Sequence, residues 1–227
     1  MTQATAQELV LAATKAPVVV KALEEDIIFG RLPPGTRLIE DSLMARFGVT
    51  RHFIRQALAQ LERTGIVIRE KNKGVTVRSL NPLEVQQIYD VREFLQRQAA
   101  LMIPLPAPAA LIEKLKAIQA DYRRHVGDRR FGGVHELNDR FHLTLFSGCE
   151  NPYLVESINH YMWLSLPVRA KTMANPDMLK ISAQHHDVMI ELLTGRDNWA
   201  LAQLCVDHLQ PSKNEYLGEV MQSVRPQ

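Results

Sequence analysis

The segment from Leu32 to Val77 constrains the fold of this chain more than any other part of it. Its sequence, LPPGTRLIEDSLMARFGVTRHFIRQALAQLERTGIVIREKNKGVTV, predicts short helices followed by a two-stranded hairpin. In the third predicted helix, Ile54, Leu58 and Leu61 recur at helical spacing and form one apolar stripe. The polar side of this helix carries Arg51, Arg55 and Gln56. An apolar back and a basic, hydrogen-bonding front suit a helix that reads the major groove of DNA.

Glycines, prolines and capping residues delimit the elements of this first region. Val18–Phe29 has the apolar period of a helix, and Gln7–Thr14 is compatible with a further short helix that Pro17 ends or kinks. We expect Asp41 to cap the second helix of the motif and Thr50 to cap the third. The predicted strands of the hairpin are Ile66–Ile68 and Val75–Val77.

The charge is distributed unevenly along the chain. Residues 1–80 contain 12 Lys or Arg and 8 Asp or Glu, whereas residues 81–227 contain 15 and 17. The formal net charge of +2 therefore hides a basic N-terminal region (12 − 8 = +4) and a slightly acidic remainder (15 − 17 = −2). Because positive charge is concentrated around the predicted helix and hairpin, it can neutralise DNA phosphates.

Several classes of protein are disfavoured by composition. The chain has no apolar run near 18 residues and no secretion signal, so we expect a cytoplasmic protein without a membrane span. Its two cysteines, Cys149 and Cys205, are then expected to be free buried thiols.

Beyond Asn81-Pro82 the pattern is helical throughout, and it predicts an all-α antiparallel six-helix bundle. The fold class is therefore mainly α, with a winged helix-turn-helix (three helices and a hairpin wing) in residues 1–80 and the bundle in 81–227. The six predicted helices are Leu83–Ile103, Ala109–Val126, Val134–Ser147, Tyr153–Thr172, one from Asn175-Pro176 to about Thr194, and one from Asp197 to about Val220.

A possible metal site lies within the predicted bundle. Asn138 and His142 are four residues apart and share one face of a helix. His186 and His208 fall on the last two predicted helices, where antiparallel packing can place them at one depth. Three histidines and an oxygen donor suit zinc or another first-row divalent ion. His185 projects about 100° away from His186 around the same helix.

Two other interpretations of the bundle remain open at this point. A metal-dependent hydrolase or lyase, with the basic region as a targeting module, would need a general base beside the ligands, and no HExxH-type motif supplies one. Alternatively, the bundle binds an acid directly without any metal. Histidines at such spacings also occur without binding anything.

The chain resembles the GntR superfamily of bacterial transcription regulators. The segments PPGTRL, LMARFGVTR, IRQALAQLERTGIV and KNKGVTV are similar to its winged helix-turn-helix. The segments DVREFLQRQAA, LNDRFHLTLFSGCENPYL and QHHDVMIELLTGRDNWALAQLCVDHL resemble the ligand-sensing FCD domain of its FadR-like branch. Together these segments span about residues 18–220.

The resemblance implies roles for particular residues of the bundle. It implies a divalent metal ion (Zn, Ni or Mn) held by Asn138, His142, His186 and His208, and it favours His186 over His185. It also implies a small organic acid effector near the metal, helped by an arginine. Arg92 is the first candidate, and Arg140 and Arg169 are further ones.

The resemblance also implies which residues read DNA and how the protein assembles. It implies a homodimeric, ligand-responsive repressor, not an enzyme, that binds double-stranded operator DNA with pseudo-palindromic sequence. His52 and Gln56 stand where the family often has Thr and Glu, and Gln96 stands where its first sensor helix usually has Glu. The residues implied in DNA binding are Thr50, Arg51, His52, Arg55, Gln56, Lys71, Lys73 and Gly74.

Overall fold

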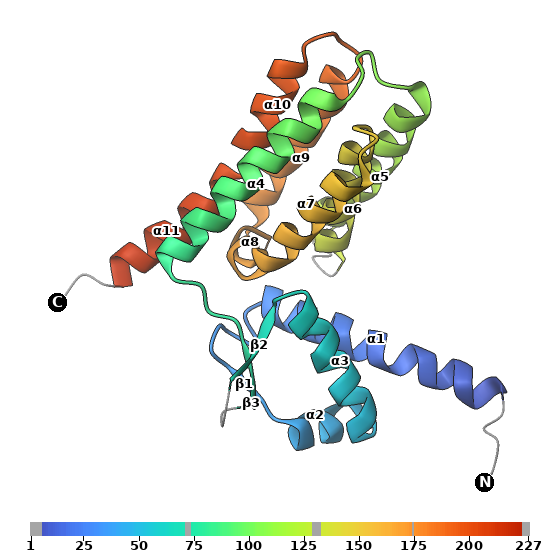
Figure 1. Ribbon diagram of the computed structural model, residues 1–227, viewed down its shortest axis with the longest axis vertical. Coiled ribbons are helices and arrows are strands. Elements are labelled where there is room, and N and C mark those ends of the chain that lie inside the picture. Colours follow the sequence, from blue (N-terminus) through green and yellow to red (C-terminus); the bar gives the residue numbers. More distant parts are fainter. Residues whose placement is uncertain (1–5, 71–73, 129–132, 174, 224–227) are drawn as a thin grey trace. The chain divides into compact units, whose positions relative to one another are not determined.

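Helices α1 to α3 and a small antiparallel sheet form the first of the two units into which the chain divides, residues 1–80 and 81–227 (Figure 1). The computed structural model describes residues 6–70, 74–128, 133–173 and 175–223. The elements of the first unit are α1 (Ala6–Ile28), β1 (Arg37–Leu38), α2 (Glu40–Phe47), α3 (Arg51–Arg63), β2 (Val67–Glu70) and β3 (Gly74–Val77). Pro17 lies within α1 and does not end it.

Helix α3 has the predicted amphipathic character. Its stripe of Ile54, Leu58 and Leu61 is at most 1% exposed, and the helix packs on α1 and α2. Burying an aliphatic side chain of this size stabilises a fold by about 1.5–3 kcal/mol. The stripe therefore fixes which side of α3 faces the interior, and it leaves the basic side to solvent.

One of the two predicted helix caps of this unit differs from the structure. The N-cap of α2 is Ile39, so Asp41 lies in the first turn of the helix and not before it. A carboxylate at that position still interacts favourably with the helix dipole. Thr50 is the N-cap of α3 as expected, but its side chain makes no capping hydrogen bond.

The wing belongs to a three-stranded sheet, whereas the sequence predicts two strands. The strand order is β1-β3-β2, with Leu38 opposite Val75 in one antiparallel pair and Val67 opposite Val77 in the other. Strand β1 has only two residues, so it is too short to show the alternation of polar and apolar residues that identifies a strand.

The second unit is helical throughout the residues that the structure describes, so the predicted fold class is confirmed. Two of the six predicted helices are divided, and a proline accounts for each division. Pro167 and Pro211 lie in the first turns of α8 and α11, where a missing N–H is tolerated but a continuous helix is not. The helices are α4 (Pro82–Met102), α5 (Ala109–Gly127), α6 (Val134–Ser147), α7 (Pro152–Leu164), α8 (Leu166–Met173), α9 (Pro176–Leu192), α10 (Asn198–Asp207) and α11 (Gln210–Ser223).

Helix α4 has a central place in the second unit. It packs against α10, α7 and α11, and α5 packs against α6 and α9 (Figure 1). The core between them is apolar, and it contains Phe141, Leu145 and Phe146, all fully buried. Cys149 and Cys205 are both free and buried in this core, as expected. None of the described helices is long and apolar enough to span a membrane.

The connection between the two units is short and anchored at both ends. The backbone N–H of Arg78 donates to the carbonyl of Ile66 at 2.9 Å, which ties it to the first unit. Asn81 forms a capping box with Glu84: the Asn81 side chain accepts from the Glu84 N–H, and the Glu84 carboxylate accepts from the Asn81 N–H. Only Ser79 and Leu80 lie between these anchors.

Candidate functional site

The exposed side of α3 carries the side chains that the sequence assigns to DNA. Arg51, His52, Arg55 and Gln56 are all exposed, and so is Thr50 at the helix N-cap. Four donors on one solvent-facing side match what hydrogen bonding to base edges and phosphates requires.

Both arginines of α3 are paired with acidic residues at the start of α2. Arg51 donates to Asp41 at 2.5 Å, and Arg55 donates to both oxygens of Glu40 at 3.0 and 3.1 Å. Arg51 also lies 3.6 Å from Glu40. The helix pattern does not predict these pairs, because they join residues 10 and 15 positions apart on different helices. They hold the guanidinium groups over the exposed side of α3.

Part of the predicted wing contribution lies outside the described residues. Lys71 and Lys73 belong to residues 71–73, for which we make no structural statement. Gly74, the first residue of β3, has a φ of 83°. This left-handed conformation disfavours residues with a Cβ, so a glycine suits this end of the hairpin.

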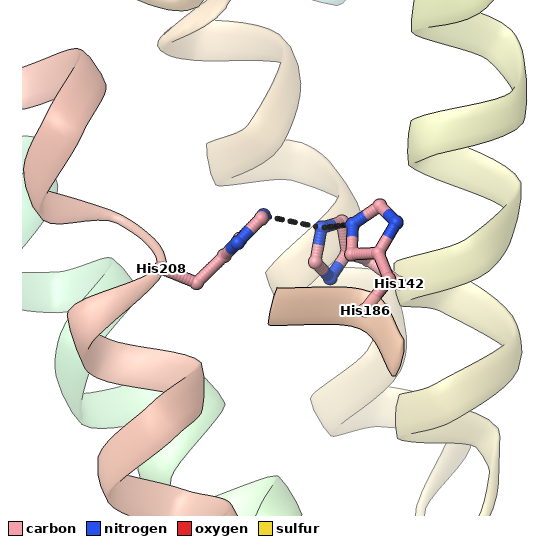
Figure 2. A group of neighbouring side chains, drawn as sticks. All are labelled: His142, His186 and His208. Atoms are coloured by element: carbon pink, nitrogen blue, oxygen red, sulfur yellow. Dashed lines mark hydrogen bonds between the residues drawn. The ribbon is translucent and has the colours of Figure 1, made fainter. Parts of the chain in front are cut away.

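Three predicted metal ligands meet in the interior of the second unit (Figure 2). His142 comes from α6 and His186 from α9, and His208 is the C-cap of α10. Nε2 of His142 lies 3.0 Å from Nε2 of His208 and 3.3 Å from Nε2 of His186. Figure 2 shows the three rings pointing toward one another from separate segments of the chain.

The spacing of these nitrogens fits a metal ion. For ligands about 2.1 Å from an ion, adjacent donors are roughly 3.0 Å apart in octahedral and roughly 3.4 Å apart in tetrahedral geometry. The observed distances of 3.0 and 3.3 Å fall at these values. The ligand atoms of the three histidines all lie within 4.8 Å of one another, which is close enough for the three residues to hold one ion.

Gln119 of α5 sets the tautomer of His186. The amide nitrogen of Gln119 donates to the carbonyl of Ala183 and to Asp187, both at 2.8 Å, which fixes the orientation of the amide. Its Oε1 therefore faces Nδ1 of His186, 3.1 Å away, and can only accept. The proton of His186 must then sit on Nδ1, so Nε2 carries the lone pair that a metal requires.

His185 supports the cluster from the side. Its Nδ1 lies 3.3 Å from Nδ1 of His208, so it can accept the proton of that nitrogen when Nε2 of His208 faces the other two rings. This arrangement agrees with the choice of His186 over His185 as a ligand. His185 is then a neighbour that orients His208.

Burial keeps the cluster neutral. It lowers the pKa of His142 and of His186 well below 6.5, and it lowers the pKa of His208 to about 3, with the neighbouring imidazoles adding to the effect. Neutral imidazole is the form that binds a metal, because the protonated ring has no lone pair to offer.

Asn138 lies beside this cluster. It is 8% exposed and lines the same cavity as His142 and His208. Its Nδ2 donates to Asp139 at 3.4 Å, and a carboxylate in that position can only accept. The carbonyl oxygen of Asn138 is thus the atom left for a ligand. All four candidate donors are therefore uncharged.

Two of the three candidate arginines line the cavity next to the histidines. Arg92 of α4 is 4% exposed, and its guanidinium lies 4.9 Å from the centre of the Tyr89 ring. Burial lowers the pKa of Arg92 to about 10, so it remains charged at neutral pH. Arg169 of α8 is 5% exposed and also lines the cavity. Arg140, by contrast, is exposed on α6 and is not among the lining residues, so we leave it out of the site.

Arg169 is neutralised by Asp139, the residue that follows Asn138 on α6. Its two terminal nitrogens lie 2.6 and 3.3 Å from the two oxygens of Asp139, and one of them also donates to the carbonyl of Met162 at 3.0 Å. The pair spans 30 residues of sequence, so spacing alone could not reveal it.

Gln119 was also missed, although the sequence contains a signal for it. It lies on the buried face of α5 with Leu115, Ile118 and Tyr122. A polar residue on an apolar helix face must find a hydrogen-bond partner, and this predicts a buried contact without naming the partner.

Comparisons with known proteins give a family match for each of the two parts of the chain. Residues 15–77 match the model of the gntR family of bacterial regulatory proteins, and residues 87–211 match that of the FCD domain. The chain is 26% identical over 218 residues to the HTH-type transcriptional repressor RspR of Escherichia coli K12, covering 91% of this chain and 87% of that protein. It is 28% identical over 142 residues to the HTH-type transcriptional regulator YdhC of Bacillus subtilis, covering 61% of this chain and 62% of YdhC.

A solved structure shares the fold. A GntR-type transcriptional regulator from Rhodococcus sp. RHA1 superimposes with a TM-score of 0.72 at 21% identity, covering 90% of this chain and 98% of that one. A gntR-family winged helix-turn-helix followed by an FCD domain defines a class of DNA-binding transcription regulators. The chain belongs to the gntR family of bacterial regulatory proteins and carries an FCD domain. It is a transcription regulator and not an enzyme, which rejects the hydrolase or lyase alternative.

Proposed function

We propose that this regulator is a repressor that binds a pseudo-palindromic operator as a homodimer and senses a small organic acid. Residues 1–80 are the DNA-binding domain, and residues 81–227 are the effector-binding and dimerisation domain. One recognition helix contacts too few base pairs for a specific site, and a two-fold dimer matches a two-fold operator. The relative RspR, which is named a repressor, supports this sign of regulation.

The DNA interface of the proposal consists of α3 and the wing. Arg51 and Arg55 suit guanine edges and phosphates, and their exposed positions favour this role. Glu40 and Asp41 neutralise them in the free protein, so operator binding exchanges these carboxylate partners for DNA. The remaining proposed contacts are Thr50, His52, Gln56, Lys71, Lys73 and Gly74.

The sensing site of the proposal is the cavity that Arg92, Arg169 and the histidine cluster share. A divalent ion (Zn, Ni or Mn) would be held by Asn138 and the three histidines, and it would supply a Lewis-acidic position for the effector carboxylate. Arg92 attracts that carboxylate. The observation that carries the sensing role is a charged arginine buried beside three converging neutral imidazoles. Ligand binding there shifts the population of conformations and so changes operator affinity.

The proposal is tested with DNA from immediately upstream of the gene, against scrambled DNA, by fluorescence anisotropy at two salt concentrations. We expect tight, salt-sensitive binding that prefers the upstream fragment. Arg51→Ala should weaken specific binding by about 1–3 kcal/mol. The matched control is Arg196→Ala, an exposed arginine of the second unit, which should leave the affinity unchanged.

Unchanged operator affinity in the Arg51→Ala variant would contradict the proposal that α3 recognises the operator. Equal, weak binding to every fragment, including fragments selected from the whole genome with zinc present, would contradict operator recognition. Sedimentation that shows a single chain in both the free and the DNA-bound protein would contradict the dimer.

A further inference from the structure

Arg92 is a buried cation that lacks a counter-ion. Its Nε and Nη1 are buried and make no hydrogen bond to any described residue. Its guanidinium lies over the Tyr89 ring and hydrogen-bonds with the Tyr89 side chain, neither of which supplies a full negative charge. A buried charge without a counter-ion is costly to the fold, so a position like this one calls for an anion.

The carboxylate of Asp139 is not available to neutralise Arg92. Both oxygens of Asp139 are occupied by Arg169, at 2.6 and 3.3 Å. Of the two buried arginines that line the cavity, Arg169 is therefore paired with a carboxylate and Arg92 is not. One positive charge, that of Arg92, remains uncompensated.

Gln96 occupies the position from which the chain could have supplied the counter-ion itself. It lies four residues after Arg92 on α4, where side chains share one helix face, and it lines the same cavity. It is 2% exposed. A glutamate here would neutralise Arg92, whereas a glutamine of the same shape does not.

The other polar groups of the wall are engaged within the protein. Ser212 donates to the carbonyl of Leu209 at 3.1 Å, so the Tyr89 hydroxyl, 2.8 Å away, must donate to Ser212. The Thr172 hydroxyl donates a hydrogen bond to the carbonyl of Arg169 at 2.9 Å. The side chain of Ser182 is hydrogen-bonded to that of Tyr122. The rest of the wall away from the histidines is apolar, with Met173, Met178, Leu179, Ile181 and Leu209.

We propose that Gln96 is the specificity-determining residue of the sensing site, because its neutral amide leaves Arg92 to be neutralised by the carboxylate of the effector. This proposal rests on the acid-sensing function proposed above. The cavity volume of about 60 Å³ limits the ligand to a compact carboxylate, since one water molecule needs roughly 10–15 Å³ by the same measure. The part of the ligand beyond the carboxylate lies against the apolar wall.

The test compares Gln96→Glu with Gln98→Glu in the full-length protein. Gln98 is exposed on the same helix, so the control makes the same chemical change outside the cavity. Thermal melting and calorimetric titration are run in buffer free of carboxylates and phosphate, once with a chelator and once with zinc. The ligands are straight-chain and 2-hydroxy carboxylates of two to six carbons, with inorganic phosphate for comparison.

We expect Gln96→Glu to raise the melting temperature without ligand by roughly 2–4 °C, because the introduced carboxylate neutralises Arg92. Its affinity for the best carboxylate should fall by at least about tenfold, which is the loss of one favourable charge pair. Gln98→Glu should change neither quantity. A Gln96→Leu variant, which is also neutral, should keep the affinity within about threefold.

Two results would overturn the assignment of Gln96. One is a Gln96→Glu protein that binds the carboxylate as tightly as the unmodified chain does. The other is a Gln96→Leu protein that loses as much affinity as Gln96→Glu, since shape and not charge would then decide. If none of the carboxylates changes the melting temperature of the unmodified protein, acid sensing itself is contradicted, and this proposal with it.

Discussion

At the scale of single residues, the histidine cluster depends on side chains that touch no ligand. Gln119 forces the proton of His186 onto Nδ1, and its own orientation depends on Asp187 and a backbone carbonyl. His142 has no such support: its Nδ1 is buried without a hydrogen-bond partner among the described residues. The metal affinity of the site should therefore respond strongly to the one imidazole whose tautomer the protein fixes.

Gln119→Leu should lower zinc affinity by about 10–100-fold, which is the usual effect of losing a hydrogen-bond partner of a ligating histidine. A competition titration against a chromophoric chelator measures this change. His208→Ala, which removes a proposed ligand, should lose more affinity than Gln119→Leu. Exposed His160 provides the control, since His160→Ala should bind zinc as the unmodified chain does. Undiminished zinc affinity in Gln119→Leu would show that the tautomer of His186 is set in another way.

The buried histidines also predict how stability depends on pH. The pKa values of His142, His186 and His208 lie below 6.5 in the folded protein, so the unfolded chain binds more protons below that pH. The free energy of unfolding of the metal-free protein is then highest above pH 6.5. It should fall as the pH drops below 6.5, by up to about 1.4 kcal/mol per pH unit for each histidine.

Urea unfolding between pH 8 and pH 5, followed by tryptophan fluorescence, measures this dependence. Both tryptophans, Trp163 and Trp199, belong to the second unit, so the signal reports on the unit that holds the cluster. Substituting His208 with Gln should make the dependence shallower, whereas His160→Gln should leave it as it is. A profile that stays flat below pH 6.5 would mean that the three rings are protonated in the folded state.

Sequence patterns predicted some residues of the site and not others, for a physical reason. His142 and Asn138 share a helix face, and helical spacing places them together without further information. Arg92 and Arg140 look alike in sequence, yet one is buried in the cavity and the other is exposed. Which side of a helix faces a cavity depends on packing between helices that are distant in sequence, and local periodicity does not encode it.

At the scale of elements, the sequence predicts the first residues of the helices better than it predicts where a long helical pattern is divided. Asn81, Asn151 and Asn175 each precede a proline and cap the following helix with the side chain. The divisions before α8 and α11 also have prolines, but a proline in a helical pattern can kink or end a helix. The sequence alone therefore did not separate α7 from α8 or α10 from α11.

Asn81→Ala should lower the stability of the second unit by about 1 kcal/mol, because it removes the capping box at the start of α4. The midpoint of urea unfolding by tryptophan fluorescence measures this loss. Gln87→Ala, at an exposed position within the same helix, should cause no loss, since alanine is the better helix former. Equal midpoints for Asn81→Ala and the unmodified protein would show that the cap does not stabilise α4.

At the scale of the whole molecule, the two units are joined by a short connection, along which the proposed coupling between sensing and DNA binding would pass. The Arg78 backbone is bonded to Ile66 in one unit, and Asn81 begins α4 of the other. The distance that these residues can span is at most roughly 10 Å. Helix α4 also carries Arg92 and Gln96, so the helix that receives the effector charge in our proposal is the one joined to the wing.

Inserting Gly-Ser-Gly-Ser between Ser79 and Leu80 should leave zinc binding and carboxylate binding intact but reduce their effect on operator affinity. Couplings between sites are typically about 5–150-fold, and we expect the insertion to reduce this one to about twofold or less. Anisotropy with and without the best carboxylate measures the coupling. The same four residues placed between Gly195 and Arg196, in the turn before α10, should not alter it. Full coupling in the first variant would mean that the signal bypasses the connection.

The shortness of this connection also bears on how the regulator chooses among genomic sites. A dimer whose DNA-binding domains hang on long flexible tethers can accept half-sites at many separations, because each domain finds its own half-site independently. Two residues between anchored ends give little such freedom. In the dimer that we propose, this connection would discriminate against correct half-sites at the wrong separation, without any contact to the bases between them.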